Sequence, residues 1–189
     1  MFIQTEPTPN PATLKFIPGR VVMEDGTANF TDADLAQQSP LAEALFALPG
    51  VTGVFYGGDF ISVTKDDDTD WTELKPQVLG TVMQHYTSEA PLFTSDATIA
   101  AGTADVAMDD DPADAQVTDA IKELLDTRVR PVVAQDGGDI VYQGFKEGIV
   151  YLHMQGACSG CPSSTMTLKN GIENLLRYYV PEVVEVRPV

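Results

Sequence analysis

The sequence predicts an α+β protein made of two small α/β-sandwich domains joined by an acidic linker. The stretch SDATIAAGTADVAMDDDPADA, at residues 95–115, lacks aromatic and basic residues and any sustained apolar period, which is typical of a linker. Runs with strand-like and with helical apolar spacing occur on both sides of it. The 189 residues are 43% hydrophobic, which supplies a packed core for each domain. We therefore expect domains at 1–94 and 116–189.

The first domain opens with TEPTPNPATLKF, whose three prolines enforce an extended chain before a strand around Leu14 and Phe16. A helix is expected to begin after Ser39, because serine is a good N-cap and the proline after it suits the first turn. A Pro-Gly pair ends this helix. The segment GVTGVFYGGDFISVTKD then shows two β-rich runs around Gly57-Gly58, which indicates a hairpin.

A second helix of this domain is expected after Asp70, which forms a capping-box pattern with Glu73. Its apolar positions follow helical spacing: Trp71, Leu74, Val78, Val82 and Tyr86. The expected element order is therefore strand, helix, hairpin, helix, with the helices on one face of a sheet.

The second domain has the predicted order α-β-β-α-β. An apolar stripe from Val117 to Val129 predicts a helix that ends at Pro131. The turn residues DGGD lead into the strand IVYQGF, and the chain returns through the strand IVYLHMQG. A second helix begins at Pro162 and stops before Pro181, after which VVEVRPV forms the last strand.

The charge of the chain limits its partners. With 28 Asp and Glu against 11 Lys and Arg, the formal net charge is -17. We therefore expect neither nucleic acid nor a membrane as a partner, because both require local positive charge. Nineteen acidic and four basic residues lie at or before Ala115, against nine and seven after it, so the second domain is nearly neutral. The run Asp109, Asp110 and Asp111 is typical of solvated chain rather than of a metal site.

The first forty residues do not resemble a targeting segment. Lys15 and Arg20 are their only cations, and five acidic residues accompany them. Mitochondrial presequences are rich in arginine and poor in acidic residues. We therefore expect a cytoplasmic protein, with the mature form of an organellar protein as the alternative.

The only two cysteines, Cys158 and Cys161, lie together in the loop GACSGCPSST between a strand and a helix. A helix N-terminus favours anions, so we expect it to lower the pKa of these thiols. Gly156 and Gly160 let backbone N–H groups approach sulfur or a bound inorganic anion. Thiolates are metal ligands and nucleophiles, so this loop is the candidate site.

Three chemistries compete for this loop. A dithiol–disulfide redox pair normally follows the first strand of a βαβ unit, whereas this motif follows a late hairpin. A structural zinc site takes four Cys or His ligands, but His85 is expected on a helix of the other domain and His153 on a strand face. A cubane iron–sulfur cluster takes four thiolates. One chain supplies two of them, so ligand counting predicts a symmetric dimer around the metal.

The second domain resembles the C-terminal domain of the NifU-like (Nfu-type) iron–sulfur cluster scaffold and carrier proteins. The matching segments are RPVVAQDGGDI, YLHMQGACSGCPSSTMTLKNGIENLL and PEVVEV. TEPTPNPATLKF, GVTGVFYGGDFISVTKD and the helix from Trp71 resemble the N-terminal domain of the two-domain members. Together these segments cover nearly all of the chain except the linker.

The resemblance implies that Cys158 and Cys161 ligate a 4Fe–4S cluster shared by two protomers, with a 2Fe–2S cluster as the alternative cargo. It implies a carrier rather than an enzyme, which receives its cluster from an upstream donor and transfers it to apo-proteins. The first domain, which has no cysteine, would then recognise or orient these targets. Two other classes stay open at this point: a thiol–disulfide oxidoreductase that uses the same C-x-x-C, and a structural adaptor.

Overall fold

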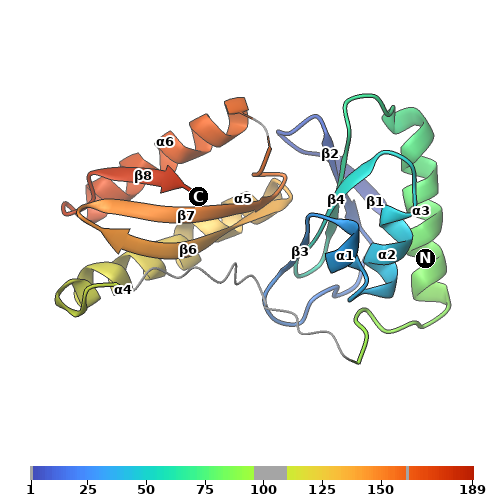
Figure 1. Cartoon of the computed structure of the whole chain (residues 1–189), viewed down its shortest axis with the longest axis horizontal. Coiled ribbons are helices and arrows are strands. Elements are labelled where there is room, and N and C mark those ends of the chain that lie inside the picture. The colour runs from blue at the N-terminus through green and yellow to red at the C-terminus, as the bar shows by residue number, and fades with distance from the viewer. Residues whose placement is uncertain (1, 96–109, 161) are drawn as a thin grey trace. The chain divides into compact units, whose positions relative to one another are not determined.

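The computed structural model describes residues 2–95, 110–160 and 162–189 (Figure 1). The chain divides into two compact units, Met1–Gly102 and Thr103–Val189. Residues 96–109 of the predicted linker lie outside the described residues, so the domain limits given above stay predictions. Among the helices so described, none is long and apolar enough to cross a bilayer.

The first unit is built on one five-stranded antiparallel sheet in the order β1-β2-β5-β4-β3. Helices α2 and α3 lie on the same side of this sheet (Figure 1), and their leucines and valines share a core with Phe16, Val54 and Tyr56. The elements are β1 (Gln4–Pro7), β2 (Thr13–Ile17), β3 (Ala28–Phe30), α1 (Ala33–Ala36), α2 (Pro40–Phe46), β4 (Val51–Tyr56), β5 (Ile61–Lys65) and α3 (Trp71–Thr87).

The helix starts of this unit follow the predicted caps. The Ser39 hydroxyl accepts a hydrogen bond from the backbone N–H of Ala42 at 3.2 Å, and the Asp70 carboxylate caps α3. The hairpin tip lies one residue later than predicted, because the Gly57 N–H donates to the Phe60 carbonyl at 2.9 Å. β1, β3 and α1 were not predicted, since each has only three or four residues.

The second unit has the predicted order α-β-β-α-β. β6 pairs antiparallel with β7, and β8 adds to β7 in parallel, giving the sheet order β6-β7-β8. Its core contains Ile121 of α4, Ile140 of β6, Leu152 of β7 and Leu176 of α6. The elements are the 3₁₀ turn η1 (Pro112–Asp114), α4 (Ala115–Leu124), the π-helical turn η2 (Leu125–Val129), α5 (Arg130–Gln135), β6 (Gly138–Lys146), β7 (Ile149–Gly156), α6 (Pro162–Tyr179) and β8 (Glu185–Pro188).

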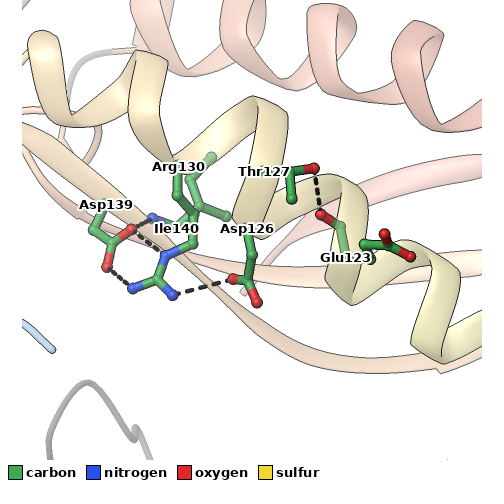
Figure 2. A network of polar contacts seen from close by, with 6 residues as sticks. All are labelled: Glu123, Asp126, Thr127, Arg130, Asp139 and Ile140. Carbon is green, nitrogen blue, oxygen red and sulfur yellow. Dashed lines mark hydrogen bonds and ion pairs between the residues drawn. The ribbon is translucent and has the colours of Figure 1, made fainter.

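The first helix of this unit does not end at Pro131, contrary to the prediction. A proline inside an α-helix lacks an N–H and clashes with the carbonyl four residues earlier. Here the π-helical turn η2 directly precedes α5, so the helix widens before Pro131 and resumes with Arg130 as its first residue. Within η2, the Thr127 hydroxyl donates to the Glu123 carbonyl at 2.6 Å (Figure 2).

The end of the acidic run is bound to the second unit. The Asp110 carboxylate accepts hydrogen bonds from the Tyr142 hydroxyl at 2.8 Å and from the Phe145 N–H at 2.9 Å, on the outer edge of β6. Asp111 caps η1, whereas Asp109 lies outside the described residues. The prediction that this run is solvated is therefore wrong for Asp110, because a free edge of a sheet offers N–H donors that a carboxylate can satisfy.

Candidate functional site

The cysteine loop connects β7 to α6, as predicted. Gly156 ends β7 and Pro162 begins α6. Cys158 lies in the described part of this loop, whereas Cys161 lies outside the described residues, so its role as a ligand stays a prediction. Gly156 and Gly160 have φ angles of 62° and 81°, in the left-handed region that favours glycine. The chain therefore turns sharply on both sides of Cys158.

The Cys158 side chain is packed into the second unit rather than exposed to solvent. The residue is 6% exposed and belongs to the same apolar cluster as Ile140 and Met154. Its N–H donates to the Gln155 carbonyl at 3.3 Å, and its carbonyl accepts a hydrogen bond from the Thr165 hydroxyl of α6 at 3.2 Å. The loop thus holds this thiol against the core.

Gly138, the first residue of β6, leaves the space in which the Cys158 thiol lies. A Cβ at position 138 would lie 2.5 Å from Cys158 Sγ and 2.7 Å from the Gln155 carbonyl oxygen, too close for either. The carbonyl of Gly137 accepts a hydrogen bond from the N–H of Ala157 in the loop, at 3.1 Å. The DGGD pattern by itself predicts only a turn. Its second glycine, which a turn alone does not require, is the signal that another group packs closely against the chain there.

The environment of Cys158 opposes thiolate formation. Burial raises the pKa of its thiol to about 12, and the carboxylates of Asp136 and Asp139 add to the increase. The prediction that the helix start lowers this pKa is therefore wrong for Cys158, because the thiol is desolvated and lies near two carboxylates. A metal that binds this sulfur must displace its proton, so binding is coupled to proton release.

A two-pronged ion pair joins α5 to the beginning of β6 (Figure 2). Arg130 donates through Nε to Asp139 Oδ1 at 2.9 Å and through Nη2 to Oδ2 at 2.8 Å, while Nη1 donates to Asp126 at 3.1 Å. The Asp139 side chain is only 5% exposed, and the hydrogen bond with it raises the pKa of Arg130. The sequence does not predict this pair, because a helix that ends at Pro131 leaves the direction of Arg130 undefined.

Neither histidine joins Cys158 in a zinc site within the described part of the chain. His85 lies on α3 in the first unit, where burial lowers its pKa. His153 Nδ1 lies 2.9 Å from the carbonyl oxygen of Val189. Across residues 2–95, 110–160 and 162–189, no three His, Cys, Asp or Glu side chains gather as a metal ion would require.

Two family models match the two halves of the chain. The model described as "Scaffold protein Nfu/NifU N terminal" matches residues 3–89, and the model described as "NifU-like domain" matches residues 121–187. The solution structure of a NifU-like protein from Saccharomyces cerevisiae is 25% identical, covers 51% of this chain and 87% of its own, and has a TM-score of 0.44.

Curated relatives match both halves at once. "NifU-like protein 5, mitochondrial" from Arabidopsis thaliana is 55% identical over 97% of this chain and 66% of its own length. The human "NFU1 iron-sulfur cluster scaffold homolog, mitochondrial" is 50% identical over all of this chain and 72% of its own length. The chain thus spans about two thirds of the length of these relatives.

These relatives correct the predicted location. Both carry mitochondrial names, as does "NifU-like protein 4, mitochondrial" from Arabidopsis thaliana. The prediction of a cytoplasmic protein is therefore wrong, and the relatives point to an organellar protein instead. It failed because it was based on the composition of the first forty residues alone.

The family to which this chain belongs follows from matches along its whole length. Both halves fit Nfu/NifU descriptions, and the human relative shares half of its aligned residues with this chain from end to end. The chain therefore belongs to the Nfu/NifU family of iron–sulfur cluster scaffold proteins.

Proposed function

We propose that this chain is a carrier that holds a 4Fe–4S cluster between two copies of itself and transfers it to apo-proteins. The observation that carries the proposal is the place of its only two cysteines, Cys158 and Cys161, in one loop before α6. That loop lies within the part of the chain matched by the NifU-like domain. A cubane cluster takes four thiolates, so one copy supplies half of the ligands and a second copy the rest.

The surroundings of Cys158 support reversible binding. Its thiol is buried against Gly138, so ligation requires the loop to turn outward and the sulfur to lose its proton. Gly156 and Gly160 are the points at which the backbone turns without side-chain strain. A loop that packs well without metal releases its cargo at a lower cost than one that folds only around the metal.

Transfer proceeds by ligand exchange where the two copies meet. Each copy provides two of the four thiolates, so separation of the copies leaves the cluster half-liganded. An acceptor with preorganised thiolates then displaces Cys158 and Cys161, and the released Cys158 sulfur regains its proton as it returns to the core. No bond of an organic substrate changes, so the proposal is a carrier rather than an enzyme.

The two halves of the chain have different charges and, we propose, different roles. After Ala115 there are nine acidic and seven basic residues, which lets two copies approach each other around an anionic cluster. At or before Ala115 there are nineteen acidic and four basic residues, which favours basic surfaces on recipients and on an upstream cluster donor. Recognition by the first half should therefore weaken as salt is added.

The test is anaerobic transfer of a reconstituted cluster to an apo-protein whose activity requires 4Fe–4S, such as apo-aconitase. The loaded chain should restore acceptor activity, and Cys158→Ala chain treated in the same way should not. Insulin reduction without metal would support the oxidoreductase instead. A colourless, zinc-loaded dimer after careful reconstitution would contradict the carrier proposal, and a two-iron product would assign the smaller cluster.

A further inference from the structure

A buried carboxylate lies next to the strand residue that supports the cysteine loop. Because Gly138 has no side chain, Cys158 Sγ lies in the space that a Cβ at this position would need. The next residue along β6 is Asp139, whose side chain is 5% exposed. The two residues are adjacent in a strand that is paired with β7 over its length. A shift of Asp139 therefore displaces the backbone against which the thiol packs.

Arg130 holds that carboxylate together with the Ile140 N–H, which donates to Asp139 Oδ1 at 2.8 Å. The two hydrogen bonds from Arg130 to the two oxygens of Asp139, at 2.9 and 2.8 Å, define both a distance and an orientation. A lysine ammonium would supply the charge but not this planar fork. Asp126, one turn earlier, holds the same guanidinium through Nη1 and limits its rotation (Figure 2).

We propose that Arg130 is a positioning residue for the cysteine loop: it holds Asp139 and, through Gly138, fixes where the Cys158 thiol lies. Without these two parallel hydrogen bonds, the buried Asp139 carboxylate is no longer well paired and moves toward water, because an unpaired charge is costly inside a protein. The start of β6 then moves with it, and the thiol loses its support. The effect of Arg130 on cluster binding rests on the proposed function. Its effect on the burial of the Cys158 thiol does not.

The decisive comparison uses two charge-conserving variants, both in metal-free Cys161→Ser protein. Arg130→Lys removes the fork, whereas Arg128→Lys changes an arginine two residues earlier whose guanidinium lies over the Tyr179 ring at 5.0 Å. The readout is the rate at which iodoacetamide alkylates Cys158. We expect Arg130→Lys to react about tenfold faster than Arg128→Lys, a factor that corresponds to the loss of one charge-assisted hydrogen bond. Equal rates in two folded variants would overturn the proposal.

A second variant keeps the test independent of folding defects. Arg130→Gln combined with Asp139→Asn removes the fork without leaving a buried charge, and circular dichroism checks that the protein is folded. Because loss of the Asp139 carboxylate by itself lowers the pKa of the Cys158 thiol, the two rates are compared per thiolate, from full pH profiles. Cys158 should still react faster per thiolate than in Arg128→Lys, and an equal rate would overturn the proposal here too.

The same Arg130→Lys and Arg128→Lys changes in the chain with both cysteines test the cluster itself. After anaerobic reconstitution, the Arg130→Lys protein should lose iron to an excess of chelator about tenfold faster than the control, and equal loss would count against the role in binding. If the unsubstituted chain takes up no cluster, the proposed function fails, while the alkylation rates still decide the role of Arg130.

Discussion

The first loop of the N-terminal unit and the cysteine loop of the C-terminal unit are both tight and close to prolines, but they are held in opposite ways. In the first loop, the Thr8 hydroxyl donates to the Asn10 carbonyl at 2.8 Å, and Asn10 Oδ1 accepts a hydrogen bond from the Ala12 N–H at 3.0 Å. Trp71 Nε1 donates to the Pro11 carbonyl at 3.1 Å. These polar groups are satisfied within the loop and by one neighbouring helix.

The cysteine loop, in contrast, is held through the packing of its buried thiol against another strand. Gly138 leaves room for the Cys158 thiol. Arg130 binds Asp139, the residue that follows Gly138 on the same strand. In the described part of the chain, the buried Oε1 of Gln155 has no hydrogen-bond partner. The first loop keeps its local polar contacts, whereas the second buries a thiol and follows a strand with an unsatisfied amide oxygen, a departure that is expected more often at functional sites.

Replacing Cys158 with alanine tests this difference most severely. Iron bound after anaerobic reconstitution should fall from about four atoms per dimer to none, because one thiolate per copy cannot hold a cubane cluster. Iron and acid-labile sulfide analysis measures this, with Ser159→Ala as the control in the same loop. A full cluster in the Cys158→Ala dimer would show that the ligand is another residue.

The pH dependence of Cys158 alkylation tests the electrostatics of the loop in metal-free Cys161→Ser protein. The pKa of this thiol is raised to about 12, so only a small fraction is thiolate at neutral pH. The rate should therefore increase about tenfold per pH unit between about pH 7 and 10, whereas a free cysteine, with a pKa of about 8.5, levels off. A plateau near the free-cysteine pKa would contradict the buried position of the thiol.

Alanine at position 138 tests the packing of the loop. A Cβ there meets Cys158 Sγ and the Gln155 carbonyl, so we expect a loss of about 1–3 kcal/mol in the free energy of unfolding. Gly171→Ala is the matched control, because nothing lies within 4 Å of its Cβ on α6. It should gain about 0.5–1 kcal/mol. Urea unfolding compares the two, and equal stabilities would contradict the contact with the thiol.

Phenylalanine at position 56 tests the other side of the comparison. Tyr56 and Ser39 share a buried hydrogen bond of 2.8 Å, and its loss should cost about 0.5–1.5 kcal/mol of unfolding free energy. Because the change lies in the N-terminal unit, iron bound after reconstitution should equal that of the unsubstituted chain. A drop in bound iron would mean that cluster binding depends on the first unit as well.

Elements with strong local signals could be predicted from the sequence. Ser39, Asp70 and Pro162 mark helix starts by local chemistry, and each helix begins there. β3 could not be predicted, because a three-residue strand exists only by pairing with β4, and no local pattern shows that pairing. The course of the helix past Pro131 depends on a π-helical turn, which has no simple sequence signature.

The candidate site could be predicted only in part. The two cysteines and the helix after them follow from the sequence, because they are neighbours along the chain. The burial of Cys158 does not, because it results from contact with Gly138 on another strand. The Arg130–Asp139 pair was missed for the same reason, since it links a helix to a strand across a turn. Local patterns thus identify the candidate ligands, whereas tertiary contacts determine how Cys158 is held.

The most direct test of the account is the composition of the anaerobically reconstituted chain, measured by native mass spectrometry together with iron and sulfide analysis. We expect one particle that contains two chains, about four iron atoms and about four sulfides. A single chain without inorganic sulfide, or a dimer that holds only zinc, would contradict it.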